Sequence, residues 1–270
     1  MPLPFSSCGS APKIDTPSII GDRHADRARQ AIIGGKLQDA LVEYTSALAQ
    51  YQKVDELNAV AKISNDISYI LYQLGKFSES EEHALRAVKI FEAKGETANR
   101  IKALNNLASA QLNMPNKTAN ARQSFEMMIQ LLGSEKNNSH ARALIGLCQI
   151  DMLDGKSENA EQKANAAKSI LESASDPAML STCLLTLSKI CRAKGDHQTA
   201  LKHATSAYTM DISRQDPVSI LFDLYELALC TQKTDPALYK DLLNRALDCA
   251  RAQKLDYVSK EIDAMLKEIK

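Results

Sequence analysis

Turn-forming residues recur along this chain at intervals of forty residues. The recurring positions are Gly35, Gly75, Pro115, Gly155, Gly195 and Asp235. A period of this size marks a repeat protein, in which each unit is one supersecondary element that buries its apolar face only against its neighbours. The 270-residue chain is therefore expected to form one array of six units, not several globular domains.

The residues that follow these glycines repeat as well. The segments 35–48, 75–88, 155–167 and 195–208 share small or apolar residues at three- and four-residue offsets. Glycine suits the positive-φ position at which one helix ends, and the offsets mark one stripe of the next helix. Each unit is therefore predicted to be a helical hairpin. The third and sixth copies are degenerate, because Pro115 and Asp235 replace glycine and one extra residue precedes Ala121 and Tyr239.

The first helix of each hairpin carries a large residue beside a small one, about seven residues before the turn. These pairs are Ile67-Ser68, Leu107-Ala108, Leu147-Cys148, Leu187-Ser188 and Leu227-Ala228. A small side chain lets two helix backbones approach closely while its large neighbour fills the gap. Asp-Pro pairs at 176, 216 and 235 predict helix starts, with Asp as the N-cap and Pro in the first turn.

Together these patterns resemble the tetratricopeptide repeat (TPR). The period of forty is similar to the longer-helix branch of that family, typified by kinesin light chain, and the segment 103–108 is similar to one found in its repeats. The resemblance implies an all-α, right-handed superhelical solenoid of antiparallel helix pairs. Armadillo and HEAT arrays share the period but lack this glycine-to-alanine spacing. We expect a tail or tether over 1–20, six hairpins over 21–252 and a capping helix over 253–270, with about thirteen helices in all.

Composition agrees with an all-α array and narrows the function. Aromatic residues make up 5% of the chain, tryptophan is absent, and no long segment alternates with the period of a strand. Thirty-three acidic residues balance thirty-three basic ones, so no basic excess points to nucleic acid. No apolar run reaches the roughly 18 residues that span a bilayer. We expect no nucleic-acid partner and no transmembrane segment.

The sequence carries no pattern typical of an enzyme. It has no glycine-rich phosphate loop, no His-Glu-x-x-His and no Cys-x-x-Cys. Cys183 and Cys191 have helical spacing, and we interpret both as core residues, because cysteine packs as a small hydrophobe. We therefore expect no catalytic residue, no cofactor and no metal.

The N-terminal segment leaves two alternatives open. Residues 5–9, Phe-Ser-Ser-Cys-Gly, resemble the end of a bacterial lipoprotein signal, in which small residues precede a lipidated cysteine. If Met1 is the true start, the protein is expected to be cytoplasmic with a disordered tail. If an apolar segment lies upstream, Cys8 would anchor a lipoprotein in the bacterial cell envelope. Five further cysteines without an evident partner favour the reducing cytosol.

The TPR resemblance implies that the first helices line a concave groove that holds a peptide or a helix of a partner protein. The corresponding positions in this chain are Arg29, Asn65, Tyr69, Tyr72, Asn105, Ser109, Gln149, Lys189, Arg192 and Tyr225. Asparagine can bond a peptide backbone, and tyrosine offers rigid contact area with a polar tip. We expect a protein-interaction scaffold or adaptor, with Lys189 and Arg192 as a basic wall. The alternative is a structural assembly subunit, membrane-tethered through Cys8, that binds through its other face or its ends.

Overall fold

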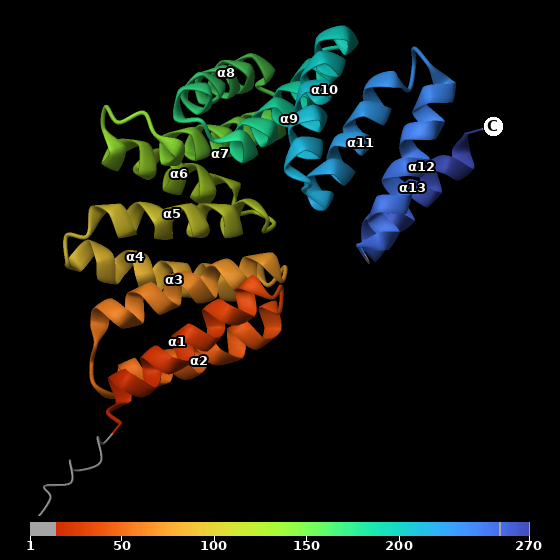
Figure 1. Cartoon of the computed structure of the whole chain (residues 1–270). Helices are drawn as coiled ribbons and strands as arrows, with labels where there is room; N and C mark the ends of the chain where they lie inside the picture. The colour runs from red at the N-terminus through yellow and green to blue at the C-terminus, as the bar shows by residue number, and fades with distance from the viewer. Residues whose placement is uncertain (1–14, 254, 270) are drawn as a thin grey trace, which may run out of the picture. The chain divides into compact units, whose positions relative to one another are not determined.

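The computed structural model describes residues 15–253 and 255–269, which form thirteen α-helices and no strand (Figure 1). This confirms the expected fold class and the expected number of helices. The helices are α1 (Pro17–Ile33), α2 (Leu37–Lys53), α3 (Leu57–Gln73), α4 (Phe77–Ala93), α5 (Thr97–Leu112), α6 (Thr118–Leu132), α7 (Asn138–Leu153), α8 (Ser157–Ala174), α9 (Pro177–Ala193), α10 (His197–Arg214), α11 (Pro217–Thr231), α12 (Pro236–Ala252) and α13 (Asp256–Glu268).

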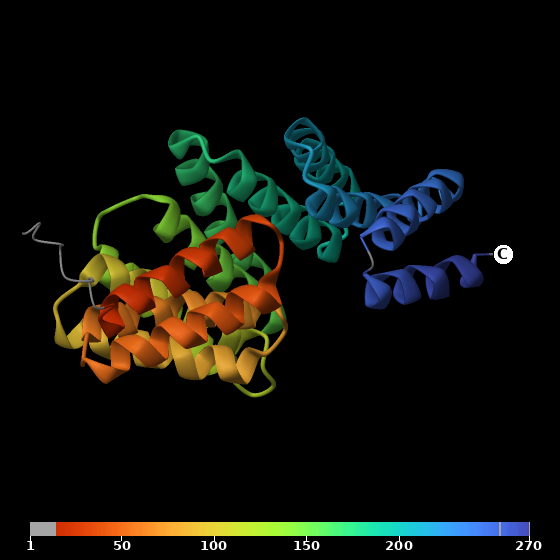
Figure 2. The same ribbon diagram turned by 60° about the horizontal axis from the view of Figure 1, so that its bottom comes forward.

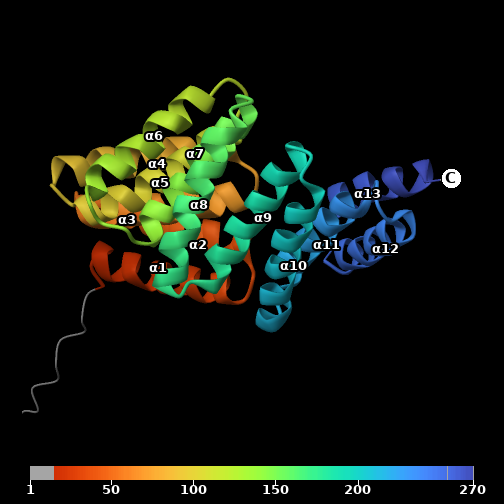
Figure 3. The same cartoon turned by 90° about the horizontal axis from the view of Figure 1, so that it is seen from above.

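The helices fall into two compact units. Unit 1 spans residues 1–110 and unit 2 spans residues 111–270. In unit 1, α1 packs on α2 and α3 packs on α4; in unit 2, α7 with α8, α9 with α10 and α11 with α12 form the same kind of pair. Figure 3 shows α9 and α10 side by side as one such pair. We call α1, α3, α5, α7, α9 and α11 the first helices, and their partners the second helices.

The expected turn glycines have the backbone geometry that the pattern predicts. Gly35, Gly75, Gly155 and Gly195 have φ of 69°, 73°, 73° and 85°. In the third hairpin the positive φ, 62°, belongs to Asn116, one residue after Pro115, which accounts for the extra residue there. In the sixth hairpin Asp235 is the N-cap of α12, and its side chain accepts a hydrogen bond from the Leu238 backbone.

A second set of positive-φ residues joins one hairpin to the next. Asp55, Gly95, Ser175 and Gln215 have φ of 52°, 69°, 53° and 54°, and they follow the same period of forty. Three of the four are not glycine, so the glycine pattern of the sequence does not predict this second set of turns. The left-handed conformation at these places is imposed by helix packing, which overrides the local preference of the residue.

The large–small pairs lie in the core. Both members of every pair from Ile67-Ser68 to Leu227-Ala228 are buried, and Ser68 and Ala108 have no exposed surface. At the C-terminal end, α13 packs on α12 (Figure 2). Its residues Val258 and Ile262 are buried in the cluster formed with α11 and α12. This apolar contact is how α13 covers the last hairpin.

One glycine in unit 2 is required by packing and not by backbone geometry. Gly146 lies within α7, where glycine lowers helix stability. A methyl group at this position would lie 2.2 Å from Cζ of Phe125, a ring on α6 that is 2% exposed. The Phe125 ring therefore packs directly against the backbone of Gly146.

We expect Gly146→Ala to lower the free energy of unfolding by about 1–3 kcal/mol, because overpacking outweighs the helix propensity of alanine. Urea denaturation followed by circular dichroism measures it. Phe125→Leu should rescue part of the loss in the double variant, since the two sites are coupled. Gly34→Ala is the control, because a methyl group there meets nothing nearer than 3.6 Å. A Gly146→Ala protein as stable as the parent would contradict this account.

Candidate functional site

A pocket of about 340 Å³ opens on the first-helix face of unit 1. Helices α1 and α3 contribute most of its walls, and the remainder comes from Tyr51 of α2 and from Glu56 before α3. The lining residues are Asp22, Ala25, Arg29, Tyr51, Glu56, Asn58, Ala59, Lys62, Ile63 and Asp66. Of the residues that the sequence pattern predicts for binding, Arg29 lines this pocket.

A second pocket, of about 280 Å³, opens in unit 2 at the matching place in the repeat. It is lined by Arg142, Ile145, Asp176, Ala178, Met179 and Thr182. Each of these residues lies three repeats after a residue of the first pocket, in the order Asp22, Ala25, Glu56, Asn58, Ala59 and Lys62. The repeat itself therefore hollows the first-helix face at this place, and the side chains decide the chemistry of each hollow.

Most of the charged groups in the pocket of unit 1 already have partners. Asp22 accepts a hydrogen bond of 2.6 Å from the Tyr51 hydroxyl, and Glu56 accepts one of 2.9 Å from the Ser18 hydroxyl. Arg29 is paired with Asp26, which raises the pKa of its guanidinium. Their charges are therefore partly satisfied within the unit.

Asp66 and Lys62 are the two remaining charged residues of the lining. Burial raises the pKa of Asp66 above its ordinary value, although Arg29 and the Tyr44 hydroxyl act in the opposite direction. Lys62 is exposed and makes no ion pair or hydrogen bond with the described residues. An anionic group in the pocket would therefore meet a free ammonium group at Lys62.

A second lysine, Lys102, lies on the next first helix and acts electrostatically on the Asp66 carboxylate. Asn106 of α5 donates a hydrogen bond of 3.0 Å to the Asn65 side-chain oxygen of α3, which holds these two helices together. Lys62 and Lys102 each lie about one helical turn before this bond, and both are exposed. Within the described part of the chain, Lys102 has no acidic side chain in ion-pair distance. The first helices α3 and α5 of unit 1 thus present two exposed lysines at equivalent repeat positions.

The structure places the other predicted residues of unit 1 in different surroundings. Tyr69 is 45% exposed on the same face of α3 as Lys62. The ring of Tyr72 instead packs against Phe77, at 5.7 Å between centroids. Asn65 is engaged by Asn106, a residue that the sequence reasoning missed because the repeat register points to Asn105.

Asn105 and Ser109 are both half-buried on α5. The Asn105 side-chain oxygen is buried and has no hydrogen-bond partner among the described residues. Asn105, which the repeat pattern predicts for binding, therefore lies on α5 with its side-chain oxygen buried.

In unit 2 the predicted residues divide into exposed and engaged side chains. Gln149 and Lys189 are exposed. Arg192 donates two hydrogen bonds, of 3.0 and 3.2 Å, to the carboxylate of Glu226, which is 1% exposed. The Tyr225 hydroxyl donates to Glu261 of α13 at 2.7 Å, and burial together with this carboxylate raises its pKa to about 12. The charge of Arg192 is therefore largely neutralised by Glu226 within unit 2.

The described residues contain no group of three histidine, cysteine or acidic side chains that could hold a metal ion. Cys183 and Cys191 are buried, which confirms their interpretation as core residues. Burial raises the pKa of the Cys148 and Cys183 thiols to about 12, so both are protonated and poor nucleophiles. Cys8 lies outside the described residues. Within those residues, no helix is both long and apolar enough to cross a membrane.

No family model and no curated protein matches the chain. Solved structures do resemble it. The apo form of RapI is 16% identical with a TM-score of 0.72, over 92% of this chain and 97% of that chain. A Rap protein complexed with Competence and Sporulation Factor is 14% identical with a TM-score of 0.69, over 94% of this chain and 76% of that chain.

A third similar structure contains the nearly identical TPR-like repeats of a putative kinesin light chain from Podosopora anserina. It is 17% identical with a TM-score of 0.57, over 75% of this chain and all of that chain. Identities this low establish a shared fold and nothing further. With its paired helices and its turns spaced forty residues apart, the chain has a tetratricopeptide-like fold.

Proposed function

We propose that this protein is an adaptor that binds an acidic peptide segment of a partner protein on the first-helix face of unit 1. The proposed site, which we call the unit 1 binding face, consists of Arg29, Lys62, Asp66, Tyr69 and Lys102. The observation that carries the proposal is the hollow between α1 and α3, lined by Lys62, which lacks an ion-pair partner among the described residues.

Four members of the face have a stated physical role in this proposal. Lys62 and Lys102 would attract carboxylates, and the exposed ring of Tyr69 would supply apolar contact with a polar tip. Asp66 can accept hydrogen bonds from peptide amide groups. The half-buried Asn65, Asn105 and Ser109 would frame the face, and Gln149 and Lys189 would occupy the matching positions in unit 2.

The fold comparisons include a structure with a bound ligand, which supports a binding role. One structure of similar fold holds Competence and Sporulation Factor, so a protein with this fold can carry a ligand. The proposed face contains no cysteine, serine or histidine, the side chains that most often act as nucleophiles or general bases. We therefore propose that this chain works by association alone.

The test is a selection of peptides from a random display library, followed by affinity measurement on synthetic peptides. We expect the selected peptides to be rich in Asp and Glu and to bind more weakly as salt is raised. Lys62→Ala combined with Tyr69→Ala should weaken binding by at least about tenfold, or about 1.4 kcal/mol. Thermal melting should be unchanged, because both side chains are exposed.

The matched control replaces a lysine and an exposed apolar residue on second helices, Lys89→Ala of α4 with Val42→Ala of α2. This control should bind like the parent. If it abolishes binding while the Lys62 and Tyr69 variant binds normally, the second-helix face is the site. That result would favour the assembly subunit over the adaptor. The lipoprotein alternative stays a prediction from Cys8.

A further inference from the structure

The seam between the last two hairpins of unit 2 breaks the apolar pattern of the seam before it. Ala141, Leu171 and Cys183 are buried together in one hydrophobic cluster between the fourth and fifth hairpins. The residues one repeat later, forty positions along the chain, are Ser181, Asp211 and Asp223. Three core positions that are apolar in one seam are thus a hydroxyl and two carboxyl groups in the next.

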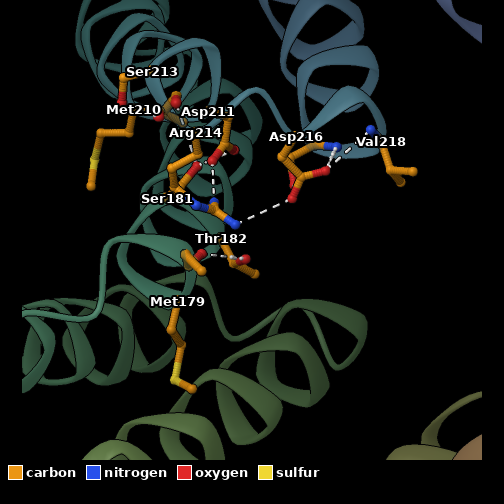
Figure 4. A network of polar contacts seen from close by, with 12 residues as sticks. Met179, Ser181, Thr182, Met210, Asp211, Ser213, Arg214, Asp216 and Val218 are labelled. Carbon is orange, nitrogen blue, oxygen red and sulfur yellow. Dashed lines mark hydrogen bonds and ion pairs between the residues drawn. The ribbon is translucent and has the colours of Figure 1, made fainter. Parts of the chain in front are cut away.

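These polar groups are as deeply buried as the side chains that they replace. Ser181, Asp211 and Asp223 are 1%, 2% and 1% exposed. The Ser181 hydroxyl donates to one oxygen of Asp211 at 2.5 Å, and the Arg214 guanidinium donates to the other oxygen at 2.5 Å (Figure 4). A further bond from Arg214 reaches Asp216 at 3.2 Å. Asp211 is therefore fully partnered.

Asp223 of α11 has no comparable partner. Neither of its carboxyl oxygens has a hydrogen-bond partner of good geometry among the described residues. The charged groups that act on it are Asp211 of α10, Asp216 before α11, and Lys189 of α9. Burial raises the pKa of Asp223 to about 8, and the neighbouring Asp211 carboxylate adds to the shift. This carboxyl group therefore keeps its proton to a higher pH than an ordinary aspartate does.

Other buried carboxylates in unit 2 have cationic partners. Asp151 is 1% exposed, but Lys163 and Arg122 pair with it at 2.5 and 2.7 Å. Burial alone would raise the pKa of Asp151, and these two hydrogen-bonded cations outweigh it and hold the pKa below its ordinary value. A buried carboxylate in this array is thus normally supplied with a cation, and Asp223 is not.

We propose that the seam between α10 and α11 is a proton-operated hinge, closed while Asp223 is neutral and opened when Asp223 loses its proton beside Asp211. The seam lies between the pair α9–α10 on one side and the pair α11–α12 with α13 on the other. This regulatory device is independent of the unit 1 binding face, because none of its residues belongs to that face.

The direction of the pH effect follows from proton linkage. The closed seam binds the proton more tightly than an open, hydrated seam, in which an aspartate has its ordinary pKa of 3.8. Closing is therefore favoured fully below that value and weakens as pH rises toward 8, on the order of tenfold per pH unit, then levels off. Between pH 6 and pH 9 the closing equilibrium should fall on the order of a hundredfold.

Amide hydrogen exchange of the whole chain tests the hinge, with each rate divided by the intrinsic rate at that pH. From pH 6 to pH 9 we expect the protection of the C-terminal part of α10 and of α11 to fall at least about tenfold. Protection of α3 and α4 in unit 1 should stay constant. Asp223→Asn should remove the pH dependence, because an amide group of the same shape does not titrate in this pH range.

Two further variants keep the test decisive. Ser181→Ala with Asp211→Leu and Asp223→Cys installs the apolar residues of the preceding seam, and it should also be insensitive to pH. Asp151→Asn removes a different buried carboxylate of unit 2, and its α10–α11 protection should keep the pH dependence of the parent. Equal protection of the parent at both pH values, or the same fall in Asp223→Asn, would overturn the hinge. A uniform fall over all helices would overturn it too.

Discussion

Arg192→Met is expected to lower the free energy of unfolding by about 3–5 kcal/mol, because it leaves the buried carboxylate of Glu226 without its cation. In the parent, the guanidinium of Arg192 and the carboxylate of Glu226 share two hydrogen bonds, and Ser188 donates a third at 3.1 Å. Methionine retains much of the side-chain volume, so the loss reports the charge. Urea denaturation followed by circular dichroism measures the change.

Two companion variants separate this effect from a general one. Glu226→Gln in the Arg192→Met background should recover most of the stability, because the uncompensated charge is gone. Arg142→Met removes an exposed arginine of the same unit and should change the free energy of unfolding by less than about 0.5 kcal/mol. If Arg192→Met were as stable as the parent but bound peptides more weakly, Arg192 would be a binding residue, as the repeat resemblance implies.

Ala40→Arg is expected to be similarly damaging in unit 1, by at least about 3 kcal/mol. Ala40 has no exposed surface and belongs to the cluster that α2 forms with α1 and α3. A long cation placed there would overpack the seam and would have no room for water or a counter-charge. Thermal and urea denaturation should both show the loss.

Val42→Arg is the matched control, two residues further along the same helix. Val42 is 59% exposed, so its replacement adds the same charge to α2 at a solvated position. We expect a change within about 0.5 kcal/mol. Equal stability of the two arginine variants would mean that the repeat register assigned to α2 is wrong.

The turns show how much of the fold can be predicted from the sequence. The positions Gly35, Gly75, Gly155 and Gly195 could be read from the chain, because glycine tolerates a positive φ at no steric cost. The second set of positive-φ turn positions, at Asp55, Ser175 and Gln215, could not be predicted in this way. Those residues adopt the same conformation against their preference, because packed helices on both sides set the course of the turn.

The unit 1 binding face shows which features cannot be predicted from the sequence. Tyr69 was predicted for the groove and is exposed on the first-helix face, whereas Tyr72, three residues later, stacks on Phe77. Lys62 and Lys102 were not singled out, although they are equivalent repeat positions and both exposed. A repeat register gives the face of a helix but not which of two neighbouring side chains finds a partner.

The sequence by itself determined the period, the helical hairpins and the positions of the small core residues, because these depend on local backbone preference and on spacing along a helix. Tertiary structure alone decided which charges are paired. Arg192 and Lys189 lie three residues apart, yet Arg192 binds a buried glutamate and Lys189 is exposed. It likewise decided that Asp223 is buried without a cation, because ionisation depends on distances between helices that the chain order does not fix.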